Sequence, residues 1–276
     1  MTALSTPLSD PPRVSVPSVA FALAKREFTR FVRQPARLAG SIGQPLLFWL
    51  VLGSGLSPSF RPTGMAAMSY TEYFYPGMLL MMVLFASVFS TITVIEDRDQ
   101  GFLQGVLVAP VSRLAIVLGK VGGAAAIALF QSIVLLCAAP VLGFSTGPLG
   151  YLLILVTLTL LSLGFTGLGF LTAWGMASTS GFHAVMMLVL MPLWFLSGAL
   201  FPVQGVPAVL EGLMMINPVT HGMTILRAPF YEAPGALLSD GSYLGSLAVV
   251  ALWVVLALGA SAWRVGRRER GAPSPS

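Results

Sequence analysis

Long apolar runs, separated by short polar segments, account for most of the sequence. Six runs of about 18 or more residues carry few or no charges, which is the length that a helix needs to cross the hydrocarbon core of a bilayer. We therefore predict an all-α polytopic membrane protein with six transmembrane helices. The predicted spans are residues 38–56, 75–95, 121–142, 149–174, 183–200 and 243–263.

Composition supports a membrane domain and leaves little room for a soluble one. Of the 276 residues, 56% are hydrophobic and only 9% are charged, whereas soluble domains carry about 25% charged residues. We predict a single six-span membrane domain at residues 19–264. A flexible cytoplasmic tail (residues 1–18) precedes it, and a basic cytoplasmic tail (residues 265–276) follows it.

The basic residues fall almost entirely on one side of the predicted spans. With six spans both termini share a side, and that side holds every lysine and arginine except Arg61 and Arg227. Positively charged loops stay in the cytoplasm. We therefore predict a bacterial inner-membrane protein with both termini cytoplasmic. Topology and anionic membrane lipid account for the basic charge, and no nucleic-acid partner is needed.

The segment before the first span has an amphipathic pattern. Apolar residues recur at steps of three and four, with basic residues beside them, which is typical of a helix that lies in the membrane interface. A cytoplasmic extension of the first span is the alternative, and Pro35 favours a break between the two. The apolar positions are Phe21, Ala24, Phe28 and Phe31, and the basic ones are Lys25, Arg26, Arg30 and Arg33.

About 42 residues separate the fifth and sixth predicted spans. Their apolar pieces are too short to cross a bilayer, and Asn217-Pro218 is a helix break. We predict an external re-entrant hairpin of two short helices packed on protein; a loosely ordered external loop is the alternative. The candidate site residues of this predicted hairpin are Pro202, Pro207, Asn217, Pro218 and Arg227.

The spans lack the groups that usually drive transport or catalysis. Ionisable residues inside a membrane mark proton and ion pathways, yet Glu96 and Lys120 lie at predicted cytoplasmic ends of spans and no span is charged near its middle. No P-loop, metal-site or hydrolase motif occurs. We predict no enzyme activity and no cofactor bound by this chain, so the energy for transport must come from another molecule.

One polar stretch, "VIEDRDQGFLQGVLVAPVSR", interrupts the apolar sequence between the second and third spans. Its acidic residues precede a short apolar helix that ends at a proline. Acids stabilise a helix N-terminus and offer ion pairs to a basic partner. We interpret the stretch as a docking element on the cytoplasmic surface; the alternative is a solvated turn.

At these residues the sequence resembles the membrane permeases of type-2 ABC exporters. That family typically has an acidic cluster, a glycine, a short helix and a "TPVSR"-like end between its second and third spans. "YTEYFYPGMLLMM" resembles the start of the family's second span, and "FLSGALFPVQGVPAVLEGLMMINPVTHGMTILR" resembles its fifth span and external hairpin. The departure is Gln104, where relatives often carry Glu, which puts one docking ion pair in doubt.

The resemblance implies that the chain works as a pair, with each copy bound to a P-loop ATPase subunit that binds ATP and Mg²⁺. A smaller contact with that subunit would come from the loop "GMASTSGFH". ATP-driven closure would switch the permease between inward- and outward-facing states. The expected coupling residues are Glu96, Asp97, Arg98, Asp99, Gly101, Phe102, Leu103, Val106, Leu107, Pro110 and Arg113.

The sequence does not identify the cargo, and it leaves several functions open. Apolar and aromatic spans favour a lipophilic or drug-like compound, as in multidrug efflux. Exporters of polysaccharide or lipid-linked glycan resemble drug exporters at this level. A self-sufficient channel or secondary carrier, or a non-transporting scaffold, are the remaining alternatives. The sequence does not distinguish a homodimer from a heterodimer, although a homodimer is our expectation.

Overall fold

The computed structural model describes residues 15–57, 69–109, 111–144 and 146–267, and within these ranges it contains helices and no strand. This confirms the predicted all-helical class. Five helical segments are long and apolar enough to cross a membrane: Pro35–Leu56, Tyr70–Asp99, Arg113–Leu142, Pro148–Ala173 and Gly241–Gly266.

The fifth predicted span corresponds to a shorter helix. Helix α8 (Thr179–Phe195) is apolar but has 17 residues, which gives about 26 Å at 1.5 Å per residue. The chain then leaves the helix through Gly198, which has a φ of 81°. Five candidate spanning helices are therefore present among the described residues, and the complete six-span topology stays a prediction.

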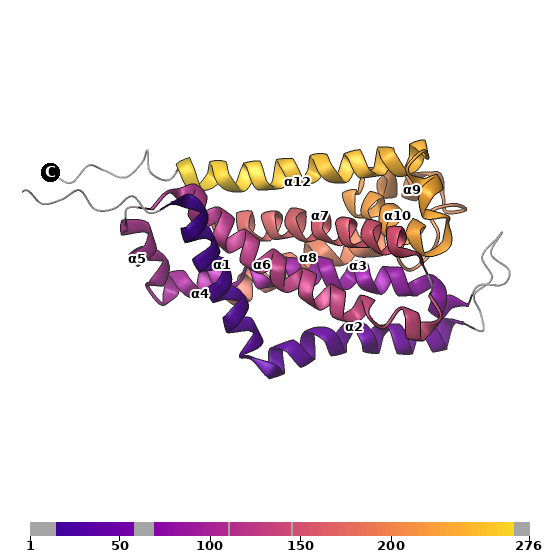
Figure 1. Cartoon of the computed structure of the whole chain (residues 1–276), viewed down its shortest axis with the longest axis horizontal. Coiled ribbons are helices and arrows are strands. Elements are labelled where there is room, and N and C mark those ends of the chain that lie inside the picture. Colours follow the sequence, from indigo (N-terminus) through magenta and orange to yellow (C-terminus); the bar gives the residue numbers. More distant parts are fainter. Residues whose placement is uncertain (1–14, 58–68, 110, 145, 268–276) are drawn as a thin grey trace, which may run out of the picture.

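The long helices run side by side along the longest axis of the molecule (Figure 1). They are α2 (Pro35–Leu56), α3 (Tyr70–Ser90), α6 (Arg113–Leu136), α7 (Pro148–Ala173), α8 and α12 (Gly241–Arg267).

Short helices gather at the two ends of this bundle. At one end, which we call the α5 end, lie α1 (Val16–Val32), α4 (Thr93–Asp99), α5 (Phe102–Val108) and the last turns of α12 (Figure 1). At the other, the α9 end, lie α9 (Ala208–Ile216) and α10 (Pro218–Tyr231), with η1 (Pro140–Leu142) and α11 (Pro234–Leu237) in nearby connections. The start of α1 and the end of α12 thus share one end, as the even number of predicted spans requires.

Helix α3 forms the centre of the bundle. It packs against α2, α6, α7 and α10, and 78% of its apolar window is buried. Its N-terminus has a capping box, in which Ser69 accepts from the backbone N–H of Glu72 and the Glu72 carboxylate accepts from that of Ser69. This reciprocal pairing satisfies two helix-end donors. Helix α2 is peripheral, with only 17% of its window buried, so its apolar face is free for lipid or a second copy.

Helix α1 is a separate element that packs on α6. It ends at Val32, and α2 begins at Pro35, so the alternative of a continuous extension of the first span is wrong. Helix α1 also starts at Val16, within the last three residues of the predicted tail, while α12 continues to Arg267 beyond the predicted end of the membrane domain.

Two glycines of α6 allow α1 to approach closely. A Cβ atom at Gly119 would lie 2.7 Å from Leu23 Cβ, and one at Gly123 would lie 2.9 Å from Glu27 Cβ. The face that α1 buries is therefore Leu23, Glu27 and Phe31. The predicted apolar stripe differs from this face, because Phe21 is 70% exposed.

In the segment between α8 and α12, helices α9 and α10 meet at Asn217, the predicted break. The Asn217 side chain accepts from the backbone N–H of Val219 at 3.0 Å and donates to the carbonyl of Leu193 at 2.7 Å. Asn217 thus caps α10 and ties it to the end of α8. Pro207 is the N-cap residue of α9, and Pro218 is the first residue of α10.

Candidate functional site

The predicted docking stretch forms two short helices at the α5 end. Helix α4 continues from the end of α3, and Gly101, with a φ of 75°, turns the chain into α5. This left-handed conformation favours glycine, since a Cβ would be strained there. The chain then enters α6 after Ser112, whose hydroxyl accepts from the backbone N–H of Ala115 at 3.1 Å.

An ion-pair cluster lies beneath these helices. The Arg26 guanidinium donates to both carboxylate oxygens of Asp97, at 2.8 Å and 3.1 Å. Arg30 donates to Asp97 at 3.3 Å and to Glu96 at 2.7 Å. Lys120 donates to Asp97 as well. The two arginines come from α1, the two acids from α4 and the lysine from α6.

Glu27 completes the cluster from α1. It accepts from Lys120 at 2.6 Å and from Arg26 at 3.1 Å. Three cations therefore face three carboxylates, and the cluster is neutral overall. Asp97 is 0% exposed, Glu27 2% and Lys120 3%. Because buried charges are tolerated only when paired and hydrogen-bonded, each of these groups depends on the others.

Within this cluster, Arg26 is charged at every physiological pH. The hydrogen bond to Asp97 raises the pKa of Arg26 above its ordinary value, although partial burial acts in the opposite direction. Arginine is protonated at all physiological pH values in any case. Arg26 therefore supplies a permanent positive charge to the contact between α1 and α4.

Helix α5 is joined to the same cluster. The Arg26 guanidinium carbon lies 3.7 Å from the centre of the Phe102 ring, a cation–π arrangement. Leu103 is 2% exposed and packs in the hydrophobic core. Phe102 thus attaches α5 to α1, and Leu103 attaches it to the core of the bundle.

A second connection leads from α4 to the loop after α7. Arg98 donates to the carbonyl of Met176 at 2.9 Å and to that of Trp174 at 2.8 Å, and its guanidinium lies 5.7 Å from the Trp174 ring centre. This loop belongs to the second predicted ATPase contact, "GMASTSGFH". The two predicted contact regions are therefore linked to each other within the chain.

Two of the acids form ion pairs within the chain. The sequence suggested that the acids offer ion pairs to a basic partner, but Asp97 is fully buried among this chain's own cations and Glu96 pairs with Arg30. Of the three acids, only Asp99 is exposed. Sequence reasoning separated the basic residues of α1 from the acids of α4 because it placed α1 on the membrane and the acids against a partner.

The exposed face of α5 differs from the expected one. Leu103 faces inward, whereas Val106 and Leu107 are partly buried and Val108, which the sequence analysis did not select, is 87% exposed. Arg113 is the first residue of α6. Pro110 lies outside the described residues.

Glu27 and Lys120 are the site residues that the sequence analysis missed. Glu27 is the one acid in the basic segment before the first span, and Lys120 is a cation close to a glycine-rich apolar run. These two isolated charges of opposite sign were the available signal that the segments pack together.

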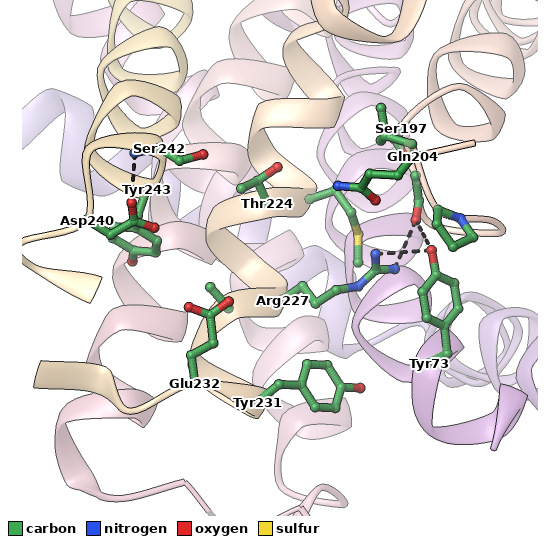
Figure 2. A pocket seen from close by; sticks show the side chains of 15 residues that line it. Tyr73, Ser197, Gln204, Thr224, Arg227, Tyr231, Glu232, Asp240, Ser242 and Tyr243 are labelled. Carbon is green, nitrogen blue, oxygen red and sulfur yellow. Dashed lines mark hydrogen bonds between the residues drawn. The ribbon is translucent and has the colours of Figure 1, made fainter. Parts of the chain in front are cut away.

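At the α9 end, Arg227 holds the connection after α8. It donates to the Tyr73 hydroxyl at 3.1 Å and to the Gly198 carbonyl at 2.9 Å (Figure 2), and its guanidinium lies 4.1 Å from the centre of the Tyr73 ring. Tyr73 also donates to the Gly198 carbonyl, at 2.9 Å. Arg227 of the predicted hairpin is thus a structural anchor between α10, α3 and the Gly198 turn. Pro202 and Arg227 both line a cavity at this end of the bundle.

Comparison with known proteins identifies the family. The ABC-2 type transporter family matches residues 19–231. The chain belongs to this family. It is similar to the putative transport permease ycf38 of Cyanophora paradoxa, with 32% identity over 75% of this chain and 72% of that protein. Nodulation protein J of Rhizobium meliloti is 30% identical over 79% of this chain and 82% of that protein.

The ABC-2 match covers both ends of the bundle described above. It includes α1, the ion-pair cluster, α5 and the hairpin as far as Tyr231. The chain is a multi-pass membrane protein and a transport permease, and its family implies an ATPase partner within the ABC system.

Proposed function

We propose that this chain is the permease subunit of an ATP-driven ABC exporter, and that the α5 end faces the cytoplasm and receives a separate ATPase subunit. The ion-pair cluster carries this proposal. A helix seated on a partner can move the bundle only if it is rigidly attached to it. Arg26 attaches α5 and α4 to α1, and Lys120 attaches α4 to α6.

The surface that we expect to contact the ATPase consists of the exposed part of α5 and the adjacent part of α1. Ser18, Ala22, Phe102, Gly105 and Val106 are among the residues that line a cavity of about 490 Å³ between α1 and α5. Its lining is almost entirely apolar, and Val108 projects beside it. Exposed apolar surface of this kind marks protein contacts, and the expected occupant is the ATPase.

The cargo that we propose is a lipophilic or drug-like compound. A cavity of about 110 Å³ between α2, α3 and α6 is lined by Met81, Met82, Phe85 and Phe89 together with the carboxamide of Gln131. Gln131 is 2% exposed, and its side-chain oxygen has no hydrogen-bond partner among the described residues. An apolar wall with a few convergent polar groups is typical of small-molecule sites.

This cavity is small for such a cargo, since ligand sites occupy about 300–1,000 Å³. It borders α2, where Gln44 also lines the cavity and is exposed. A polar side chain at membrane depth normally faces protein or water. We therefore propose that a second copy of the chain packs against α2 and completes the site, in a homodimer with two ATPase subunits. Export of a polysaccharide or lipid-linked glycan remains the alternative function of the same assembly.

The test is co-purification with a P-loop ATPase subunit that is co-expressed with the permease. Val108→Arg places a charge on the exposed face of α5 and should reduce the amount of ATPase recovered with the permease from solubilised membranes, without lowering permease yield. Val141→Arg is the matched control, because Val141 is 88% exposed but lies in η1, at the α9 end.

Equal ATPase recovery with both variants would refute docking at α5. ATP-independent transport of a lipophilic dye by the purified permease in liposomes would support the channel or secondary-carrier alternative. A complex whose ATP hydrolysis responded to no cargo would support the scaffold alternative.

A further inference from the structure

A cavity at the α9 end has a lining that no part of the proposed coupling mechanism uses. Its volume is about 420 Å³, within the range of small-ligand sites. The connection after α8, helices α3 and α10, and the start of α12 all contribute to its wall (Figure 2). This cavity is separate from the one lined by Gln131, which lies between α2, α3 and α6.

The charges in this cavity do not balance. Arg227 is the one cation in the lining, and Glu232 and Asp240 are the two acids, so the lining has an excess of one negative charge. The two terminal nitrogens of Arg227 donate hydrogen bonds to neutral oxygens, the Tyr73 hydroxyl and the Gly198 carbonyl. No ion pair joins Arg227 to either acid among the described residues.

The two carboxylates are exposed and have spare acceptor capacity. Asp240 accepts one hydrogen bond, from the backbone N–H of Ser242 at 3.0 Å, and this leaves its second oxygen without a partner within the described chain. The Glu232 carboxylate has no hydrogen bond or ion pair in the same ranges. Figure 2 shows both side chains on the side away from the Tyr73 contact of Arg227.

Aromatic rings accompany these carboxylates. Tyr243 is 3% exposed and Tyr231 is 37% exposed, and both line the cavity. The Tyr231 hydroxyl donates to the Glu72 carbonyl at 2.7 Å, which fixes the position of the ring. Aromatic faces and carboxylates are the groups that bind organic cations, whereas an anion would meet the net negative charge.

We infer that this cavity binds a monovalent organic cation with an apolar body, held by Glu232 and Asp240 and in contact with the tyrosine rings. Binding one such cation neutralises the lining. The inference goes beyond the proposed function because it assigns a second ligand site, at the end opposite the ATPase. The inference rests on the proposed function in one respect: if the chain is an exporter, the bound cation is a cargo that leaves the cell.

The experiment uses the full chain in phosphatidylcholine nanodiscs, with empty nanodiscs subtracted. Phenyltrimethylammonium is the cationic probe, and benzenesulfonate is an anion of similar size; both keep their charge at every pH used. Ligand-observed NMR titration gives the dissociation constants. We expect the cation to bind and the anion to bind at least about fivefold more weakly, which corresponds to 1 kcal/mol.

The double substitution Glu232→Gln, Asp240→Asn should weaken cation binding at least about fivefold. Both changes keep the shape, and asparagine is as good an N-cap as aspartate. Glu211→Gln is the matched control: Glu211 is an exposed acid of α9 outside the cavity lining, and its loss should leave binding unchanged.

Equal affinity for the two probes, no binding of the cation, or undiminished binding by the double variant would each overturn the inference. So would an equal loss of binding in the Glu211→Gln control. These outcomes are independent of the ATPase test. A chain that binds the cation at Glu232 and Asp240 but recovers no ATPase would retain this site and reject the proposed function.

Discussion

The Arg26 guanidinium contacts both the Asp97 carboxylate and the Phe102 ring. It donates two hydrogen bonds to the carboxylate, at 2.8 Å and 3.1 Å, and its central carbon lies 3.7 Å from the centre of the ring. One side chain of α1 therefore holds both α4 and α5. Arginine suits this position because its planar guanidinium can form a bidentate ion pair and stack on a ring at the same time.

Removing the Asp97 charge should destabilise the permease strongly. Asp97→Asn leaves Arg26, Arg30 and Lys120 with too few carboxylates in a buried site, and loss of one partner of a buried ion pair costs about 3–5 kcal/mol. We expect a clear fall in the apparent unfolding temperature of the purified protein. Asp99→Asn is the control, since Asp99 is exposed; equal effects of the two substitutions would contradict the ion-pair cluster.

Charge reversal at Arg30 and Glu96, singly and together, should measure how much their ion pair contributes beyond the effect of each residue alone. Arg30→Glu and Glu96→Arg should each lower the ATPase activity stimulated by cargo in the assembled complex, and the double variant should recover part of it. The pair is partly exposed, with side-chain exposures of 26% and 30%, so a coupling energy of about 0.2–1 kcal/mol is expected. Additive losses in this double-mutant cycle would show that the two residues act independently.

The close approach of α1 to α6 can be tested at glycines. Gly123→Ala would place a Cβ 2.9 Å from Glu27 Cβ and 3.0 Å from Ala24 Cα, and such overpacking costs about 1–3 kcal/mol. Gly122→Ala meets no atom within 4 Å and should be neutral or slightly stabilising, because alanine favours helix. Thermal unfolding of both variants is the measurement. A Gly122→Ala variant as unstable as Gly123→Ala would indicate a general intolerance of α6 to substitution.

Arg227→Gln should loosen the α9 end and leave the α5 end intact. It removes the charged donor to Tyr73 and Gly198, and such hydrogen bonds contribute about 1.5–3 kcal/mol. Hydrogen exchange should increase in the connection after α8 and in the first turns of α3, while exchange in α4 stays as in the unaltered chain. Faster exchange confined to other parts of the bundle would refute this anchoring role.

Much of the helical framework follows from local pattern. Apolar runs long enough to cross the bilayer core identify five candidate spanning helices, because a helix satisfies its own backbone groups in lipid. The break at Asn217-Pro218 and the start of α2 at Pro35 follow from proline chemistry. Helix α8 was expected to end at Leu200 but ends at Phe195, and Gly198, whose φ of 81° favours glycine, is part of the turn where the chain leaves it.

The candidate site was predicted less completely than the framework. The acidic stretch and the short helix after it were identified in the right place, and the family match includes them. The acids were expected to meet a partner, yet Asp97 meets Arg26, Arg30 and Lys120 of the same chain. Single-sequence patterns describe one element at a time, so they do not show which charges of separate elements pair.

The sequence by itself determined a membrane protein with a break between α1 and α2 and a polar stretch after α3. Tertiary structure decided that Gly119 and Gly123 admit α1 against α6, and that this contact brings Glu27 and Lys120 to the acids of α4. The physical reason is range: hydropathy and helix breaks act over neighbouring residues, whereas pairing of buried charges depends on which helices pack together.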